Sequence, residues 1–327
     1  MPVRDQLIGW LPSRRVPVWL LLLVLALSAA GILLPRPTDR TPELLVETAT
    51  LYEAIGRKDE AIEQLDEAVQ VGIRSGDALS RAGELYRTLG EYDKAVEAFT
   101  QAIKRDRRNA EYRLGLARSY SGGGQHQEAV AEYELLIESE PDNWRYHLEM
   151  GEAYEALQDY DQAIAQYTEV SDLTPDSVTG PLQLGNMYRR LERYDEAIAA
   201  YQQALEIDPE HYWGHLQLGL SYIGKREYPR AVEQHEAAIE LDPESASAYY
   251  YLGEAYLAQG LFDQALEPYQ LAIERRDEWA EPHLGLGKVY LFFGDCTKAM
   301  PEFTRVLELD ADNALAQEGI TACSEGT

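Results

Sequence analysis

The chain has 327 residues, 45% of them hydrophobic, so it is long enough to bury a sizeable apolar core. It carries 29 basic and 57 acidic residues, which gives a formal charge of −28. Because an acidic chain repels phosphate backbones, nucleic acid is excluded as an expected partner.

Residues 16–34 form an apolar run without a charged side chain. At a helical rise of about 1.5 Å per residue the run spans roughly 28 Å, close to the thickness of a bilayer core. Two alternatives fit it: an uncleaved anchor, or a signal peptide processed after Ser28-Ala29-Ala30. Since the run continues to Leu34, beyond the usual length of a signal core, we predict a single transmembrane helix.

Three arginines precede this run and two follow it, a bias that places residues 1–15 in the cytoplasm and the remaining chain on the far side. A stiff, proline-rich linker at 35–41 then leads into the body.

One pattern recurs every 34 residues through the body, without an insertion. Its alanine returns eight times, at Ala61, Ala95, Ala129, Ala163, Ala197, Ala231, Ala265 and Ala299. Self-similarity at a fixed period predicts a repeat architecture, in which each unit buries its apolar face against its neighbours.

Each unit contains two helical patterns joined by a tight turn. In the unit that begins at 178, Gly185 and Tyr188 follow helical spacing in the first pattern, and Tyr201 lies in the second. Asp195 is placed to cap the second helix, and Pro209 ends it.

These residues resemble the tetratricopeptide repeat family, whose unit is 34 residues long and carries small residues, aromatics and a turn proline at fixed offsets. The resemblance covers residues 42–313 as eight units and makes 314–327 a solvating cap helix and tail. It implies an all-α, right-handed superhelical solenoid of helix-turn-helix units, here preceded by one transmembrane helix. The units begin at 42, 76, 110, 144, 178, 212, 246 and 280.

Several residues depart from the family pattern. Ala49 and Ala117 stand where glycine is usual, and Leu65 fills an aromatic position. Pro268 and Pro301 fall inside second helices, where each removes a hydrogen bond and is expected to kink the helix.

The resemblance also implies that the first helix of each unit lines a concave groove. Large apolar side chains at groove positions favour a bound protein or peptide, with Asn186 and the arginines holding its backbone or its carboxylates. The expected partner-binding residues are Arg118, Asn186, Arg189, Arg190, Trp213, Leu216, Leu220, Tyr250, Glu254 and Leu257.

The sequence offers no catalytic or cofactor pattern. His211 and His215 have the spacing of two metal ligands on a helix, but no third ligand completes a site. His147, His215 and His283 share one repeat position, which indicates packing. We therefore expect no enzyme, no cofactor, no metal and no small-molecule substrate.

Two cysteines leave two alternatives open. Cys296 opens the second helix of the last unit, and Cys323 lies in the cap helix that packs against that unit. In an oxidising compartment they would form a disulfide that staples the cap; otherwise they are two partly buried thiols.

The sequence as a whole predicts a non-catalytic, single-pass membrane scaffold that binds a protein or peptide partner during assembly of an envelope complex. By resemblance to bacterial proteins of this arrangement, the anchor lies in the inner membrane and the repeats in the periplasm. The alternatives are a self-oligomerising platform at the membrane and a cryptic hydrolase, for which no catalytic trio is found.

Overall fold

The computed structural model describes residues 41–325, and this part of the chain consists of seventeen α-helices without a strand. The described residues divide into two compact units, the first ending at Glu140 and the second beginning at Pro141. Unit 1 contains α3 (Pro42–Ala54), α4 (Lys58–Val71), α5 (Gly76–Leu89), α6 (Tyr92–Arg105), α7 (Ala110–Gly122) and α8 (His126–Ser139). Unit 2 contains α9 (Trp144–Ala156), α10 (Tyr160–Leu173), α11 (Thr179–Arg190), α12 (Tyr194–Ile207), α13 (Tyr212–Gly224), α14 (Tyr228–Leu241), α15 (Ala246–Ala258), α16 (Phe262–Arg275), α17 (Ala280–Phe292), α18 (Cys296–Leu309) and α19 (Ala314–Glu325).

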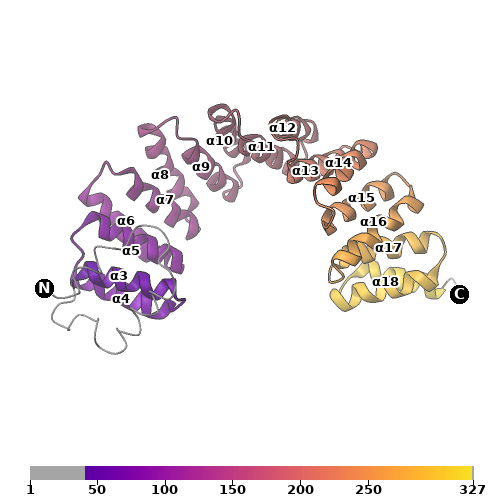
Figure 1. The fold of residues 1–327 in the computed structure, drawn as a ribbon, viewed down its shortest axis with the longest axis horizontal. Helices are drawn as coiled ribbons and strands as arrows, with labels where there is room; N and C mark the ends of the chain where they lie inside the picture. Colours follow the sequence, from indigo (N-terminus) through magenta and orange to yellow (C-terminus); the bar gives the residue numbers. More distant parts are fainter. Residues whose placement is uncertain (1–40, 326–327) are drawn as a thin grey trace. The chain divides into compact units, whose positions relative to one another are not determined.

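The helices pack in chain order within each unit, each against the one before and the one after (Figure 1). The odd-numbered helices from α3 to α17 are the first helices of the repeats, and the even-numbered ones are the second helices. In unit 2, α11 contacts α13, α13 contacts α15, and α15 contacts α17. No two second helices in the described part approach each other as extensively. First helices therefore lie on the inner side of the curve in this unit.

The turn between the two helices of a repeat uses one left-handed residue, always fifteenth in its unit. Glycine occupies it in five of the eight repeats, because glycine has no Cβ to oppose a positive φ. The other three have Gln158, Glu192 and Arg226, with φ of 60°, 57° and 65°. These three strained turns follow one another in unit 2.

Small residues let an aromatic ring enter between the two helices of a repeat. A Cβ added to Gly185 would lie 2.5 Å from Cε1 of Tyr201, a ring that is fully buried. The first repeat departs from this arrangement: Ala49 faces a cluster in which Leu65 replaces the ring, and both are fully buried. The smaller side chain of Leu65 thus accompanies the larger residue at the glycine position.

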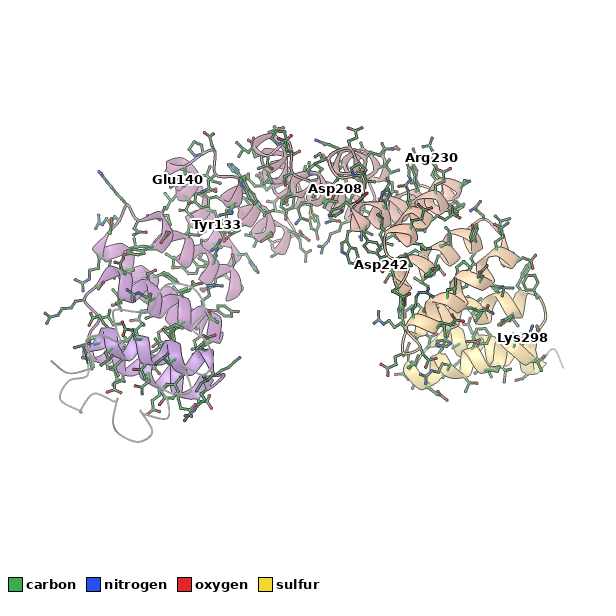
Figure 2. The ribbon with its side chains drawn as sticks, in the orientation of Figure 1. Tyr133, Glu140, Asp208, Arg230, Asp242 and Lys298 are labelled. Carbon is green, nitrogen blue, oxygen red and sulfur yellow. A yellow bond between two sulfur atoms is a disulfide. The ribbon has the colours of Figure 1, made fainter. Side chains whose placement is uncertain are left out.

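Aspartates organise the junctions between repeats in unit 2. Asp208 and Asp242, labelled in Figure 2, follow α12 and α14 at equivalent positions. Each Oδ1 accepts a hydrogen bond from the backbone N–H two residues later, at 3.2 Å from Glu210 and 3.1 Å from Glu244. These turns satisfy backbone groups that the helix ends leave open.

The expected cap of α12 is wrong. The N-cap residue is Arg193, whose side chain makes no capping hydrogen bond, and Asp195 lies inside the first turn. Its carboxylate instead forms an ion pair with Lys225 Nζ at 2.6 Å. The negative charge of Asp195 still favours the amino-terminal end of the helix.

Helices α16 and α18 continue through Pro268 and Pro301. Among the described residues no helix combines the length and apolarity needed to cross a membrane. The expected anchor at 16–34 and most of the linker lie outside the described residues.

Candidate partner-binding face

Nine of the ten expected partner-binding residues lie on three neighbouring first helices of unit 2. Helix α11 carries Asn186, Arg189 and Arg190; α13 carries Trp213, Leu216 and Leu220; α15 carries Tyr250, Glu254 and Leu257. The tenth, Arg118, lies half-buried on α7 of unit 1. We call the exposed and half-buried members on α11, α13 and α15 the first-helix face.

Trp213 is the most exposed apolar side chain of this face, at 58% of its full area. Its ring meets that of Tyr212 edge-on, with centroids 5.2 Å apart. Tyr212 is held in turn, because its hydroxyl lies 2.5 Å from Ser245 Oγ at the start of α15. Trp213 is therefore an exposed aromatic group that packs against one well-anchored ring.

Leu216 does not belong to the face. It is 1% exposed and packs with Ala238 of α14 and Ala248 of α15. Its position in the repeat turns the side chain toward the neighbouring helices, so a partner cannot reach it. Leu220 and Leu257, by contrast, are partly exposed.

Tyr250 and Glu254 are half-buried and tied into the core of unit 2. The ring of Tyr250 lies 4.7 Å from that of Trp279 and 5.0 Å from that of Tyr251, centroid to centroid. Burial, reinforced by the charge of Glu254, raises the pKa of Tyr250 above its usual range. The carboxylate of Glu254 accepts a hydrogen bond from the Tyr269 hydroxyl at 2.5 Å. Both residues thus support the first-helix face through their contacts with the core.

Asn186 binds the hydroxyl of Tyr201, and Arg189 influences its pKa. The hydroxyl donates to Asn186 Oδ1 at 2.7 Å, and the positive charge of Arg189 acts on the same hydroxyl. Burial raises the pKa of Tyr201 to about 12, although the charge of Arg189 acts in the opposite direction. The phenol therefore stays protonated and keeps donating to Asn186 at physiological pH.

Arg190 is already paired. Its guanidinium donates to Glu155 of α9 at 2.9 Å and lies over the ring of Tyr160, 5.0 Å from the centroid. It is half exposed, so the pair adds little to stability. Arg190 is less available to a partner than Arg189.

The three histidines at the fourth repeat position connect each repeat to the preceding turn. His147 Nδ1 lies 2.9 Å from Gln166 Oε1, and His215 Nδ1 lies 2.9 Å from Gln234 Oε1. The second ring nitrogen of each contacts the carbonyl oxygen of the proline six residues earlier. These hydrogen bonds give the histidine rings a structural role.

His283 differs because its partner is a carboxylate. Burial lowers the pKa of His283, but the hydrogen bond from Nδ1 to Glu302, at 2.6 Å, and the charges of Glu302 and Asp277 outweigh burial. The net effect raises the pKa of His283 above its ordinary value.

His211 caps a helix. Its Nδ1 accepts a hydrogen bond from the Gly214 backbone N–H at 3.0 Å and so caps α13. No cluster of three or more potential metal ligands occurs within residues 41–325.

Sequence reasoning missed His235. It occupies the ring position that Tyr201 holds in the previous repeat, is fully buried, and has no hydrogen-bond partner on either ring nitrogen. Burial lowers the pKa of His235 to about 3. The sequence alone could have singled out this histidine, because the ring at this position is tyrosine or phenylalanine in every other repeat from the second onward.

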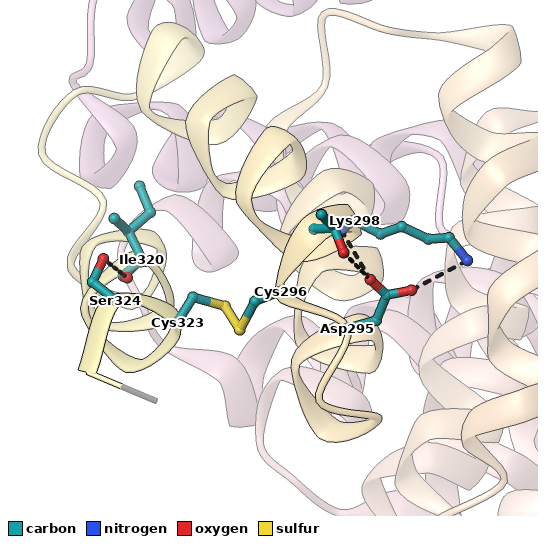
Figure 3. Close-up of a disulfide and its surroundings, with 7 residues drawn as sticks. Asp295, Cys296, Lys298, Ile320, Cys323 and Ser324 are labelled. Atoms are coloured by element: carbon teal, nitrogen blue, oxygen red, sulfur yellow. Dashed lines mark hydrogen bonds and ion pairs between the residues drawn. A yellow bond between two sulfur atoms is a disulfide. The ribbon is translucent and has the colours of Figure 1, made fainter. Parts of the chain in front are cut away.

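Cys296 and Cys323 are joined by a disulfide, with Cα atoms 5.4 Å apart (Figure 3). The bond ties the first residue of α18 to α19. The buried side of α19 also packs Ala316 and Cys323 against Phe303 and Val306. The final helix is therefore held both covalently and by apolar contact.

Two models of repeat families match the chain. One, described as tetratricopeptide repeat, matches residues 80–143, 114–178 and 216–278; the other, described as TPR repeat, matches 185–225. The model of anaphase-promoting complex subunit 5 matches residues 42–82. No curated protein sequence matches the chain significantly.

Solved structures share the fold. The carboxyl-terminal part of a TPR repeat-containing protein from Cytophaga hutchinsonii is 20% identical over 73% of this chain and 98% of its own, with a TM-score of 0.62. The APC/C hetero-tetramer Cut9-Hcn1 is 17% identical over 86% of this chain and 55% of the other, with a TM-score of 0.52. At these identities the likeness concerns the helical-repeat fold alone.

Proposed function

Because the chain belongs to the tetratricopeptide repeat family, we propose that it is a non-catalytic scaffold that binds a protein segment on the first-helix face of unit 2. The observation that carries this proposal is Trp213, a supported aromatic ring left 58% exposed between polar and apolar neighbours. Aromatic anchors of this kind dominate the energy of protein interfaces. Leu220 and Leu257 extend the apolar surface, and Asn186 and Arg189 supply donors at one edge.

We also propose a cellular location for the protein. The apolar run at 16–34 anchors the chain in the bacterial inner membrane, and the repeats form a right-handed superhelix in the periplasm, where they organise an envelope complex. Two observations support this: the length of the run, and a disulfide that suits an oxidising compartment.

The test is a double variant of the face, Trp213→Ala with Leu220→Ala, purified from native membranes with its bound proteins. Loss of the exposed aromatic anchor and its neighbour is expected to reduce the recovered partner at least tenfold, while helicity by circular dichroism stays unchanged. The matched control is Leu135→Ala with Leu241→Ala, two exposed leucines on second helices. Equal partner recovery from both double variants would refute the proposed face.

Self-assembly is the second candidate, favoured by exposed Phe292, Phe293 and Leu315 near the carboxyl-terminal end of unit 2. In that case copies of the chain would bind one another at the membrane. Light scattering of the full chain in detergent distinguishes the two: a mass that does not change with concentration and equals one chain excludes the platform.

A further inference from the structure

Four repeats join their two helices through side chains at the same two positions, the fourth and the twenty-third of the unit. In each of them the side chain on the first helix contacts the side chain on the second. The pairs are Arg113 with Glu132, His147 with Gln166, His215 with Gln234, and His283 with Glu302. These repeats therefore share the contact and differ in its charge.

The last pair has a chemistry of its own among the four. The pair of Arg113 and Glu132 is charged on both sides at any physiological pH, because a guanidinium does not deprotonate. The partners of His147 and His215 are neutral amides. Only His283 combines an imidazole, which titrates near neutral pH, with a carboxylate.

A second carboxylate lies at the other nitrogen of the His283 ring. In the other two histidine repeats, Nε2 contacts the carbonyl oxygen of a proline, Pro141 or Pro209. The corresponding residue before α17 is Asp277, whose carbonyl oxygen lies 3.2 Å from Nε2 of His283 and whose Oδ1 lies 3.6 Å from it. The His283 side chain is only 5% exposed, so water screens these charges weakly.

The partners of His283 also require two hydrogen-bond donors. A neutral imidazole has one N–H and one acceptor nitrogen, whereas a protonated imidazole has two donors. An amide offers both a donor and an acceptor, so a glutamine complements a neutral ring whose other nitrogen donates to a carbonyl. The ionised carboxylate of Glu302 and the carbonyl of Asp277 only accept. Protonated His283 therefore satisfies both partners, and the neutral ring satisfies one.

The charges around the ring agree with this geometry. Within residues 41–325 they come from Glu302 on α18 and Asp277 in the turn before α17; none comes from α15, α16 or α19, which also pack on α17. Arg305 of α18 forms an ion pair with Asp277 and so offsets part of its charge. Burial lowers the pKa of His283, but Glu302 and Asp277 outweigh burial, and the net direction is upward.

We propose that His283, Glu302 and Asp277 form a pH-responsive junction, which holds the last repeat more firmly in mildly acidic than in alkaline solution. Protonated His283 connects α17 both to α18, through Glu302, and to the preceding turn, through the Asp277 carbonyl. The cap helix α19 packs on both α17 and α18, so the junction also supports the cap.

The direction of the pH dependence follows from linkage. A group whose pKa rises on folding contributes stability that is complete below its unfolded pKa, about 6.5 for histidine. That contribution is lost as the pH rises through the folded pKa. Acid therefore stabilises the contact between α17 and α18, and alkali weakens it.

The first test is a pH titration of the imidazole NMR signals of the full chain in detergent, with ¹³C- and ¹⁵N-labelled histidine and each signal assigned by substitution. His283 should titrate at a higher pH than His147 and His215, which serve as internal controls. Glu302→Gln rebuilds the contact that Gln166 and Gln234 make, so it should return His283 to the range of the other two. A wild-type His283 that titrates with them, or below them, overturns the proposal.

The second test measures whether the titration stabilises the junction. Hydrogen exchange of the α17 and α18 amides, corrected for the intrinsic effect of pH, should show opening that increases at least about twofold more in the wild type than in Glu302→Gln between pH 6.0 and 9.0. An equal increase in the two chains overturns the junction, even where His283 titrates high.

The matched variant is Gln166→Glu, which places a carboxylate beside His147 and leaves the last repeat unchanged. It should make the exchange of α9 and α10 amides depend on pH in the same direction. Failure of this variant to gain that dependence would overturn the role assigned to the carboxylate.

Discussion

The ring of His235 is fully buried within α14, and neither of its nitrogens has a hydrogen-bond partner. In the repeats on either side, the tyrosine at this position donates to the ninth residue, Tyr201 to Asn186 and Tyr269 to Glu254. The ninth residue in the His235 repeat is Leu220, which offers no acceptor. The repeat that has histidine in place of tyrosine, and so lacks the hydroxyl donor, therefore also lacks the acceptor, because its ninth residue is leucine.

Because of His235, we expect the protein to lose stability in acid. Burial lowers the pKa of His235 to about 3, whereas the unfolded chain has a pKa of about 6.5. The stability that the neutral ring contributes is fully present above pH 6.5 and is lost as the pH falls toward 3, at about 1.4 kcal/mol per pH unit. Between pH 7.5 and 5.0, urea unfolding should show the wild-type chain losing about 2 kcal/mol more than His235→Phe.

Phenylalanine is the natural replacement because Phe99 and Phe303 fill the same position in other repeats and are buried there. The control is His215→Phe, since His215 has hydrogen-bond partners on both nitrogens. That variant should retain the wild-type acid sensitivity. The same acid loss in His235→Phe as in the wild type would mean that other groups carry it.

Single residues also show where sequence patterns stop being informative. The position of Leu216 in the repeat suggested a groove residue, but its side chain packs beneath α14 and α15. A repeat position fixes the angle around the helix, whereas exposure depends on how closely the next helices pack. Likewise, the hydrogen bond between Tyr201 and Asn186 joins two helices, and no local sequence pattern reveals it.

At the scale of elements, the turns after α9, α11 and α13 are the strained part of the array, because non-glycine residues adopt positive φ there. A left-handed conformation costs an ordinary residue about 1–2 kcal/mol. Glu192→Gly is expected to raise the free energy of unfolding by up to about 1 kcal/mol, after allowance for the greater entropy of the unfolded chain.

The matched change runs in the opposite direction. Gly260 has a φ of 76° at the equivalent turn, so Gly260→Ala should lower the free energy of unfolding by about 1 kcal/mol. Both values come from urea unfolding. A destabilised Glu192→Gly chain would show that Glu192 makes a contribution greater than the strain of its backbone.

The last helix, α19, has a covalent bond to the repeat before it, and reduction of that bond should loosen this helix first. The disulfide joins residues 27 apart, and a loop of that length stabilises by about 3–4 kcal/mol in the chain-entropy account. Hydrogen exchange should show faster exchange of α19 amides in Cys296→Ser with Cys323→Ser. The amides of α13, remote in the chain, should be unaffected, because repeat arrays transmit stability mainly between neighbours.

Much of the helix arrangement could be predicted from the sequence. First helices begin at the residues where the 34-residue units begin, except that α11 begins one residue later, at Thr179. The period carries this information because every unit repeats the same small and aromatic residues. The left-handed Gln158, Glu192 and Arg226 could not be recognised in the same way, because their residue types do not indicate positive φ.

Within residues 41–325 the protein is an acidic repeat array whose large apolar side chains are mostly buried. Trp213 is an exception: it is exposed, and it lies on α13, a first helix of unit 2. The proposed protein partner would cover Trp213 and the first-helix face around it.

The most direct measurement is site-specific photo-cross-linking in native membranes. A benzophenone amino acid at position 213 should cross-link to one discrete partner, because the exposed ring lies at the centre of the proposed contact. The same group at position 241, an exposed leucine on the second helix α14, should give none or an unrelated product. Identical products from the two positions, or no product from position 213, would contradict the assignment of the binding face.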